Sequence, residues 1–313
     1  MISIIVCTYN RDKYIYDALE SIASNDFPRN EYEIVLVNNN STDSTEEKCK
    51  MFAEKFPDVN FKYCTETKQG LSHARNKGIA VSQGDTIVFM DDDILVKSDY
   101  LKNLKENLDD ISNLMAFGGK ITPKFESGQA PKWLNRWMFS LLSAIDKGNS
   151  VKVFANGKYP IGANMGFRRK CFDECGVFNT ELGRIGDILL GGEEKDIFMR
   201  LRAKGIIPYY LPNVEIEHII PESRTTIEYI ERAGLGIGIS EQIRCTSAGK
   251  QSLRKRHFQE FVKWCGTIVL SIYYAITFRP QTSKVMLKFR KNVSKGLRLA
   301  TNQVVDTDAP EKQ

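Results

Sequence analysis

The stretch that most constrains the fold is residues 84–93, GDTIVFMDDD, where a strand pattern leads directly into three aspartates. Thr86–Met90 is a continuous apolar and β-branched run, which predicts a strand buried on both faces, as in a parallel sheet. Asp91, Asp92 and Asp93 repel one another, so their place at a strand end favours a nearby cation or many donors. Oxygen ligands suit Mg²⁺ or Mn²⁺. A solvated acidic loop leading to a helix explains the triplet equally well.

Three further strand patterns precede this one, and each leads into a helical pattern. The strands are expected at Ile2–Thr8, 33–37 and 61–64, and the helices at 13–24, 42–56 and 71–82. Strands that alternate with helices predict an α/β fold with a doubly wound, mainly parallel sheet flanked by helices. Ligands of such sheets bind beyond the carboxyl ends of the strands, so polar residues there are candidate site residues.

Polar side chains follow the first two strands at this predicted edge. The first strand ends in TYNR, in which Thr8 and Asn10 can hydrogen-bond a base or ribose and Arg11 can neutralise phosphate. The second leads into NNNSTD, which contains Asn38 and Asn40. Strand-to-helix turns and helix caps use the same residue types for purely structural reasons. It is the convergence of these stretches with the aspartates at one edge that favours a binding site.

Two further candidate residues lie in other predicted elements. Arg75 is in the helix before the acidic strand, and His218 is in a strand near the end of the α/β region. Arg75 belongs to the helix at 71–82, where it either faces a diphosphate or pairs with an aspartate of the triplet. His218 ends the alternating stretch 209–218, which predicts a strand with Val214 and His218 on one apolar face. A histidine in that position is more often a hydrogen-bonded core residue than a metal ligand.

A second acidic cluster lies at 191–205, GGEEKDIFMRLRAKG, which predicts a helix that begins with acids. Glu194 precedes apolar residues by three and four positions, so its carboxylate is expected on the inner face of the helix. Compensation of the helix dipole by Glu193, Glu194 and Asp196 is the simpler explanation. The two glycines before the helix, including Gly192, favour a ligand-binding role in addition, because glycine lets the backbone approach a ligand closely.

Taken in order and at these spacings, ISIIVCTYNR, EIVLVNNNSTDST, GLSHARNKGIAVSQGD and IVFMDDD resemble the nucleotide-binding half of family 2 glycosyltransferases, which have the GT-A fold. The resemblance covers about residues 1–218. It implies a divalent cation, Mn²⁺ or Mg²⁺, that bridges the diphosphate of a nucleotide sugar, with UDP favoured as the nucleotide. The metal ligands that it implies are Asp93, Asp91 and His218, with Asp92 nearer the sugar or ribose.

The resemblance also extends to the Glu-Asp motif of inverting transferases, in which the second acid is the catalytic base. It implies Glu194 as the base and Glu193 as a contact to acceptor hydroxyls, with Asp196 as an alternative because Glu replaces the usual Asp. Asn38 stands where many relatives carry Asp, which leaves the base of the nucleotide open. The nucleotide-sugar contacts that follow are Thr8, Asn10, Arg11, Asn38, Asn40, Arg75, Asp91, Asp92 and Gly192.

Two segments between these motifs carry weaker signals. Residues 131–144 are expected to be helical, with Trp133 and Trp137 on one face. The two rings either pack in the core, stack on a sugar or lie at a membrane interface. The stretch 161–178 resembles the acceptor side of the family, with Asn164 and Arg168 as candidate site residues.

The last quarter of the chain is predicted to be a helical appendage. Between 250 and 298 it carries twelve Lys and Arg and one acid, a net charge of +11 that leaves −6 for the rest of a chain of net charge +5. The uncharged stretch 264–278 is about 22 Å long as a helix, too short to span a bilayer of ~30 Å. Its basic flanks suit either an anionic membrane surface or packing on the enzyme or a second subunit.

These features predict three regions: a catalytic domain at 1–222, a helical region at 223–305 and a disordered tail at 306–313. Seven cysteines without a CxxC pair predict free thiols in a reducing compartment. The expected activity is metal-dependent, inverting transfer of a sugar to a hydroxyl of a glycan or lipid-linked acceptor, in bacterial surface polysaccharide synthesis. The enzyme is expected in the cytoplasm, or peripherally at the inner face of the cell membrane, without a nucleic-acid partner; the oligomeric state stays open.

Three alternative functions remain at this point. A polyprenyl-phosphate acceptor is already ionised and needs no catalytic base. A nucleotidyltransferase would need a glycine-rich phosphate loop after the first strand, and TYNRDKY contains no glycine. A non-catalytic nucleotide-sugar-binding module would leave Glu194 and His218 without a function.

Overall fold

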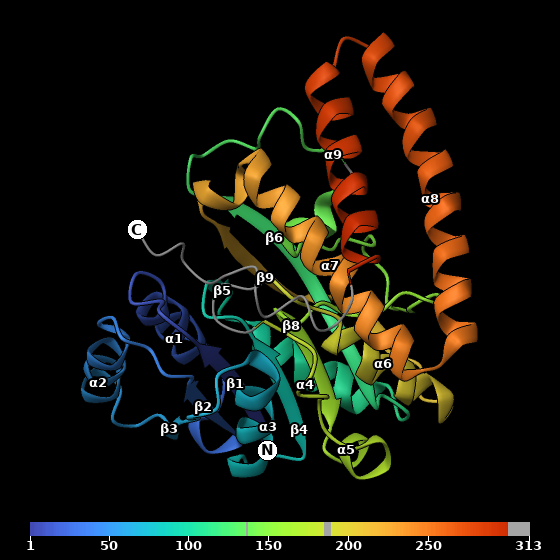
Figure 1. Cartoon of the computed structure of the whole chain (residues 1–313). Coiled ribbons are helices and arrows are strands. Elements are labelled where there is room, and N and C mark those ends of the chain that lie inside the picture. Colours follow the sequence, from blue (N-terminus) through green and yellow to red (C-terminus); the bar gives the residue numbers. More distant parts are fainter. Residues whose placement is uncertain (136, 185–188, 300–313) are drawn as a thin grey trace. The chain divides into compact units, whose positions relative to one another are not determined.

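The computed structural model describes residues 1–135, 137–184 and 189–299 (Figure 1). The tail expected at 306–313 lies outside these residues. The chain forms two compact units. The sheet unit comprises Met1–Gly128, Leu142–Glu181 and Glu193–Ile220, and the helical unit comprises Gln129–Leu141, Leu182–Gly192 and Pro221–Gln313.

The sheet unit is built on one mixed sheet in the order β3-β2-β1-β4-β8-β6-β9-β5, with β7 paired to β9. Its strands are β1 (Ile2–Thr8), β2 (Tyr32–Asn38), β3 (Phe61–Thr65), β4 (Thr86–Met90), β5 (Ile94–Val96), β6 (Ala116–Phe125), β7 (Lys152–Val153), β8 (Asn164–Arg168) and β9 (Tyr209–Ile220). Strands β1 to β4 are parallel to one another, which confirms the predicted α/β fold and all four predicted strands.

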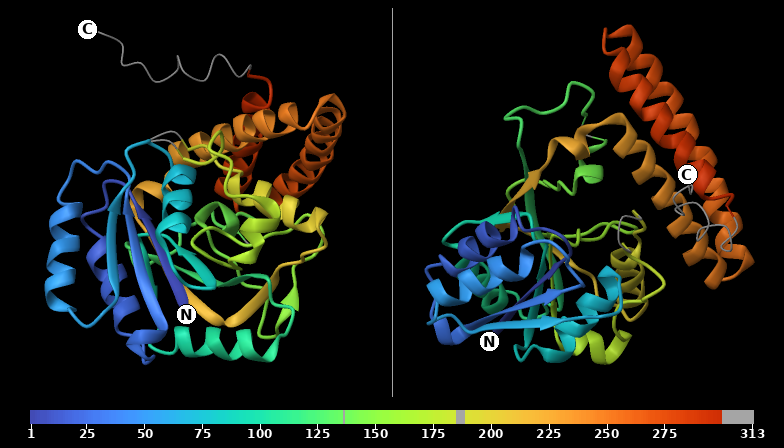
Figure 2. Two further views of the ribbon diagram at one scale, coloured as in Figure 1. Left: turned by 90° about the horizontal axis from the view of Figure 1, so that it is seen from below. Right: turned by 60° about the vertical axis from the view of Figure 1, so that its left-hand side comes forward.

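Helices cover both faces of this sheet, as Figure 2 shows. They are α1 (Ile15–Ala23), α2 (Thr45–Lys55), α3 (Leu71–Val81), α4 (Tyr100–Asp110), α5 (Lys170–Cys175) and α6 (Glu193–Ala203). Alternate residues of each central strand enter two separate apolar clusters: Ile4 of β1 packs with α1, α2 and α4, and Ile5 packs with α3, α5 and α6. Both faces of these strands are buried, which explains why their sequences are continuous apolar runs.

The second half of the sheet contains antiparallel strands that the helical alternation did not indicate. Strand β8 pairs antiparallel with both β4 and β6, and β9 pairs parallel with β6 and antiparallel with β5. The short β5 follows directly after the aspartates, and Ile94 pairs with His218. This register brings the acidic strand end to the histidine that lies more than a hundred residues further along the chain.

The prediction of a helix at 131–144 was wrong for the residues that the structure describes there. This segment consists of turns and a 3-10 helix at Phe139–Leu142. The side chain of Asn135 accepts a hydrogen bond from the backbone N–H of Trp137 at 2.9 Å, a local bond that competes with helix formation. Trp133 is buried and donates from Nε1 to the Thr225 carbonyl at 2.9 Å, whereas Trp137 is exposed, so the two rings share no face.

The helical unit contains α7 (Ile227–Ser247), α8 (Lys250–Ile276) and α9 (Pro280–Gly296), which confirms the predicted helical C-terminal region. Two short 3-10 helices elsewhere in the chain lie at Arg29–Glu31 and Glu222–Thr225. Helix α9 packs closely on α7, because a Cβ on Gly238 would lie 2.2 Å from the Val293 carbonyl. Across the described residues, no helix is long and apolar enough to cross a membrane.

Candidate active site

The loops that follow β1, β2 and β3 are joined to one another at the carboxyl edge of the sheet. Thr8 pairs in register with Asn38, and the N–H of Asn39 donates to the Thr8 carbonyl at 2.9 Å. Asn10 and Asn40 adopt positive φ angles of 52° and 63°, a conformation that asparagine tolerates better than most residues. These two positions turn the chain away from the strands into the loops.

The predicted asparagines bond to these loops through their side chains. Asn38 donates to the Tyr63 hydroxyl at 2.8 Å and accepts from the Ser41 N–H at 2.9 Å. Asn40 donates to the Thr67 carbonyl at 2.7 Å, and Asn10 accepts from a backbone N–H of the β2–α2 loop at 2.8 Å. Asn10, Asn38 and Asn40 therefore lie at the carboxyl edge of the sheet, as predicted, and their side chains fix the shape of the loops there.

The acidic triplet lies at the same edge, immediately after β4. Asp92 is almost fully buried, and Arg11 Nε lies 3.5 Å from its Oδ1. Burial raises the pKa of the Asp92 carboxyl, and the nearby Asp93 raises it further, while Arg11 and the Thr8 hydroxyl act in the opposite direction. Arg11, a predicted nucleotide-binding residue, therefore pairs with the predicted sugar-side aspartate.

Asp91, Asp93 and His218 form a three-residue group that can hold a metal ion, with ligand atoms within 4.8 Å of one another. His218 is fully buried, and its Nδ1 lies 3.2 Å from the Leu142 carbonyl oxygen. Because a carbonyl only accepts, Nδ1 carries the hydrogen, which leaves a lone pair on Nε2 of the neutral ring. Nε2 lies 2.9 Å from Asp93 Oδ1, so either a proton or a cation must separate the two acceptors. Two carboxylates and an imidazole held by a backbone carbonyl fit Mn²⁺.

Arg75 connects the acidic edge to the first turn of α6. Its Nη1 lies 3.0 Å from Glu193 Oε1 and its Nη2 lies 3.5 Å from Glu194 Oε1. Burial opposes the charge on Arg75, but the carboxylates of Glu194, Glu193 and Asp91 outweigh burial and raise the pKa of the guanidinium. The two acidic clusters, which are a hundred residues apart in the sequence, thus act on one cation. Its guanidinium also lies over the Phe178 ring, 5.4 Å from the centroid.

The two glutamates differ in their access to solvent. The side chain of Glu193 is 3% exposed and that of Glu194 is 20% exposed. The buried stripe of α6 begins at Glu193 and continues at Ile197, so the inner face starts one residue earlier than the sequence indicated. Burial raises the pKa of the Glu193 carboxyl, the adjacent Glu194 raises it further, and Arg75 lowers it only in part. Asp196 is bound instead by Arg200, at 2.9 Å.

Gly162 is a site residue that the sequence did not identify. A Cβ at this position would lie 2.3 Å from Arg75 Nη2 and 2.4 Å from Glu194 Oε1. Only glycine therefore leaves room for the observed arrangement of both side chains. The stretch 161–178 predicts only Asn164 and Arg168 as candidate site residues, and no local pattern indicates that Gly162 faces α3 and α6.

Asn164 and Arg168 have structural partners elsewhere in the sheet. Asn164 is fully buried, accepts from the Tyr100 hydroxyl at 2.7 Å and donates to the Val214 carbonyl at 2.9 Å. Arg168 donates to the Thr86 hydroxyl at 3.0 Å, at the opposite end of β4 from the aspartates. Gly192 belongs to the helical unit and adopts a φ of +94°, which favours glycine directly before the first residue of α6.

The sheet carries its acidic residues at the carboxyl edge of its strands, where ligands of such folds bind. The chain belongs to glycosyl transferase family 2, whose family model matches residues 3–176. It is therefore a glycosyltransferase with a GT-A-like fold.

Two curated relatives match about three quarters of the chain. A dolichyl N-acetyl-alpha-D-glucosaminyl phosphate 3-beta-D-2,3-diacetamido-2,3-dideoxy-beta-D-glucuronosyltransferase of Methanococcus voltae is 33% identical over 254 residues, 75% of this chain and 74% of the relative. A glucosyl-dolichyl phosphate glucuronosyltransferase of Haloferax volcanii is 24% identical over 247 residues, 77% of this chain and 76% of the relative. Other relatives are much longer, and the chain spans only 12% and 15% of the length of two of them.

A solved structure shares the fold over most of the chain. The mannosyltransferase PcManGT from Pyrobaculum calidifontis, in complex with GDP-Man and Mn²⁺, has a TM-score of 0.62 at 18% identity, and the match covers 94% of this chain and 87% of that one.

Proposed function

We propose that the protein is a metal-dependent, inverting glycosyltransferase that moves a sugar from a nucleoside diphosphate to a hydroxyl of a lipid-linked saccharide or glycan. The observation that carries the proposal is the position of Arg75. Glu194 of α6 and Asp91 of the acidic triplet both act on its guanidinium, so a candidate base and a candidate metal group lie in one neighbourhood.

In this proposal Asp93, Asp91 and His218 hold Mn²⁺ or Mg²⁺. The bound ion would supply electrostatic stabilisation of the diphosphate as negative charge develops on it. The imidazole of His218 is already oriented for metal binding, because the Leu142 carbonyl fixes its tautomer and leaves Nε2 directed at Asp93. Arg11 holds Asp92 next to this group, in reach of the ribose or the sugar. Asn10, Asn38 and Asn40 shape the loops that would surround the nucleotide.

The proposed catalytic base is Glu194. A base must reach the hydroxyl that it deprotonates, and Glu194 is the partly exposed glutamate of the pair. Glu193 is buried against Arg75, so we give it the role of holding Arg75 in place. Arg75 in turn orients the Glu194 carboxylate, because its Nη2 lies 3.5 Å from Glu194 Oε1. Asp196 is held by Arg200 and is the weakest candidate. Proton transfer to a positioned carboxylate typically accelerates a reaction by about 10²–10⁴-fold.

A lipid-linked saccharide is the acceptor that the relatives favour. Both archaeal relatives carry names that describe glucuronosyl transfer to a sugar on dolichyl phosphate. Such acceptors present a sugar hydroxyl, which requires a base, rather than an ionised phosphate. We place the reaction at the inner face of a cell membrane, in the synthesis of a surface polysaccharide.

The donor test is a panel of UDP-, GDP- and dTDP-sugars, each with Mn²⁺ or Mg²⁺, scored by thermal stabilisation and slow donor hydrolysis. We expect one nucleotide family to stabilise the protein, with UDP as the first candidate from the sequence and GDP included because PcManGT was solved with GDP-Man. EDTA and Asp93→Asn should both abolish the effect. Stabilisation that survives both changes would refute the metal assignment.

A transferase whose acceptor is polyprenyl phosphate is the second candidate. In the relatives' names the dolichyl phosphate already carries a sugar, so what they share with this candidate is a lipid phosphate in the acceptor and not a phosphate that receives the sugar. Glu194→Gln separates the two, because an already ionised phosphate needs no base. Retained transfer in this variant would favour the phosphate acceptor, and a loss of about 10²-fold or more would favour the hydroxyl.

A further inference from the structure

Helix α8 of the helical unit presents an apolar face to solvent. Its exposed apolar side chains recur at intervals of three and four residues, and the series ends at Ile276, which is 71% exposed. Phe278, in the turn that follows, is 94% exposed. The exposed members are Phe258, Phe261, Val262, Cys265, Ile268, Val269, Ile272, Tyr273 and Ile276. We call these residues and Phe278 the outer face of α8.

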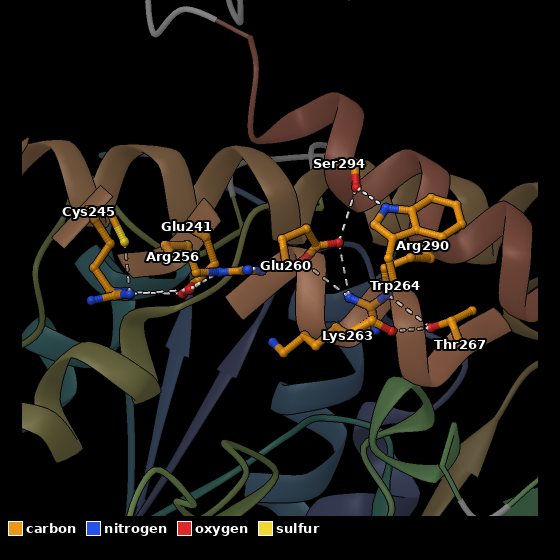
Figure 3. Close-up of polar contacts among 10 residues, drawn as sticks. Glu241, Cys245, Arg256, Glu260, Lys263, Trp264, Thr267, Arg290 and Ser294 are labelled. Carbon is orange, nitrogen blue, oxygen red and sulfur yellow. Dashed lines mark hydrogen bonds and ion pairs between the residues drawn. The ribbon is translucent and has the colours of Figure 1, made fainter. Parts of the chain in front are cut away.

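The opposite side of α8 carries charges and is buried within the helical unit. Figure 3 shows this inner cluster, in which Glu260 of α8 receives Arg256 Nη1 at 2.9 Å and Arg290 Nη1 of α9 at 3.2 Å. Arg256 also donates to Glu241 of α7 at 2.8 Å. Trp264 donates from Nε1 to the Ser294 hydroxyl of α9 at 2.8 Å. Helix α8 is therefore reversed relative to an ordinary surface helix, which buries its apolar side.

This inner cluster fixes the rotation of α8. Turning the apolar face inward would leave Glu241 of α7 and Arg290 of α9 without their partners on α8 and would place both charges against apolar groups, which is strongly unfavourable. The outer face is thus a permanent feature of the helical unit. An apolar row of this length on a stable helix indicates a surface that is covered by a partner.

Charge identifies the partner. Exposed basic residues lie at the start of α8, at Lys250, Arg254 and Lys255, and on α9, at Lys284 and Lys291. The outer face between Trp264 and Phe278 contains no charged residue. An apolar centre with basic flanks matches an anionic bilayer, whose headgroups attract the lysines while the apolar side chains enter the acyl boundary.

We propose that the outer face of α8 docks the protein on an anionic lipid bilayer, with the helix lying in the plane of the membrane. This inference goes beyond the proposed reaction, since it rests on the helical unit alone and does not depend on donor, metal or base. The structure supports lying on the membrane rather than crossing it, because none of the described helices meets the length and apolarity that a span requires.

Cys265 provides a direct probe, because it lies on the outer face and is the exposed cysteine among the seven. The full-length protein is labelled there with an environment-sensitive fluorophore and mixed with phosphatidylcholine vesicles that contain or lack phosphatidylglycerol. We expect a blue shift and co-sedimentation with the anionic vesicles only, weakened by salt. Val269→Glu with Ile272→Glu should lower the partition coefficient at least ~10²-fold, the order expected for losing two buried aliphatic contacts.

Met51→Glu with Ile207→Glu is the matched control, because it places the same two charges on exposed apolar residues of the sheet unit. It should bind vesicles like the wild type. Circular dichroism confirms that each variant is folded, and donor hydrolysis measured without vesicles should be the same in all of them. Equal vesicle binding by the double variant of α8 and the control would overturn the proposal. A blue shift that rises with protein concentration in the absence of vesicles would also overturn it, in favour of a second copy of this chain.

Discussion

Gly162→Ala tests whether close packing around Arg75 and Glu194 sets the rate of transfer. The added Cβ would lie 2.3 Å from Arg75 Nη2 and 2.4 Å from Glu194 Oε1, whereas ordinary contacts begin at 3.4 Å. Each side-chain end must therefore withdraw by about 1 Å, and misplacement of that size can lower a rate by about 10²-fold. Overpacking costs about 1–3 kcal/mol, and we expect the lower end because both atoms end flexible side chains.

The assay is the initial rate of nucleoside diphosphate release at varied donor concentration, combined with thermal unfolding. We expect kcat to fall by about 10²-fold while KM for the donor and the metal-dependent stabilisation change little. Gly266→Ala is the control, because nothing lies within 4 Å of its added Cβ. A Gly162→Ala enzyme with the kcat of the wild type would refute the inference that Arg75 orients Glu194.

Three further predictions address the metal group, the helical unit and the thiols. His218→Asn should remove the stabilisation by Mn²⁺ and donor, measured by thermal unfolding; an unchanged Mn²⁺ response would exclude His218 as a ligand. Glu260→Ala should destabilise the helical unit by about 3 kcal/mol in urea unfolding, because Arg290 loses its carboxylate and Arg256 keeps only Glu241. A loss below about 1 kcal/mol would contradict a desolvated network. A thiol reagent at pH 8 should modify the exposed Cys265 first and leave Cys49 intact in the native protein, since burial raises the pKa of Cys49 to about 12. Peptide mapping that finds Cys49 modified first would show that its burial is wrongly assigned.

The parallel half of the fold follows from local patterns. Continuous apolar runs such as Thr86–Met90 are long enough to define strands, and each is separated from the next by a helical period. The carboxyl-edge rule then brings Thr8, Asn38 and the aspartates together without further information. The sequence did not show whether these asparagines bind a ligand or the loops, because asparagine side chains form hydrogen bonds of both kinds.

The remaining features depend on contacts between distant segments. The pairing of Ile94 with His218 sets the metal group, yet β5 has only three residues and no pattern of its own. Adjacent residues on a helix differ in direction by 100°, and periodicity wrongly placed Glu194 instead of Glu193 on the buried face of α6. The outer face of α8 was visible as an apolar stripe, but only the buried Arg256 and Glu260 show that this stripe points outward.

The division of labour between Asp93 and Glu194 is the central claim, and calorimetric titration tests it most directly. The nucleoside diphosphate that stabilises the wild type is titrated with Mn²⁺ into the wild type, Asp93→Asn and Glu194→Gln, and transfer is measured on the same samples. We predict that Glu194→Gln binds like the wild type but transfers about 10²–10⁴-fold more slowly, whereas Asp93→Asn loses Mn²⁺-dependent binding. Wild-type binding by Asp93→Asn, or wild-type transfer by Glu194→Gln, would contradict the assignment.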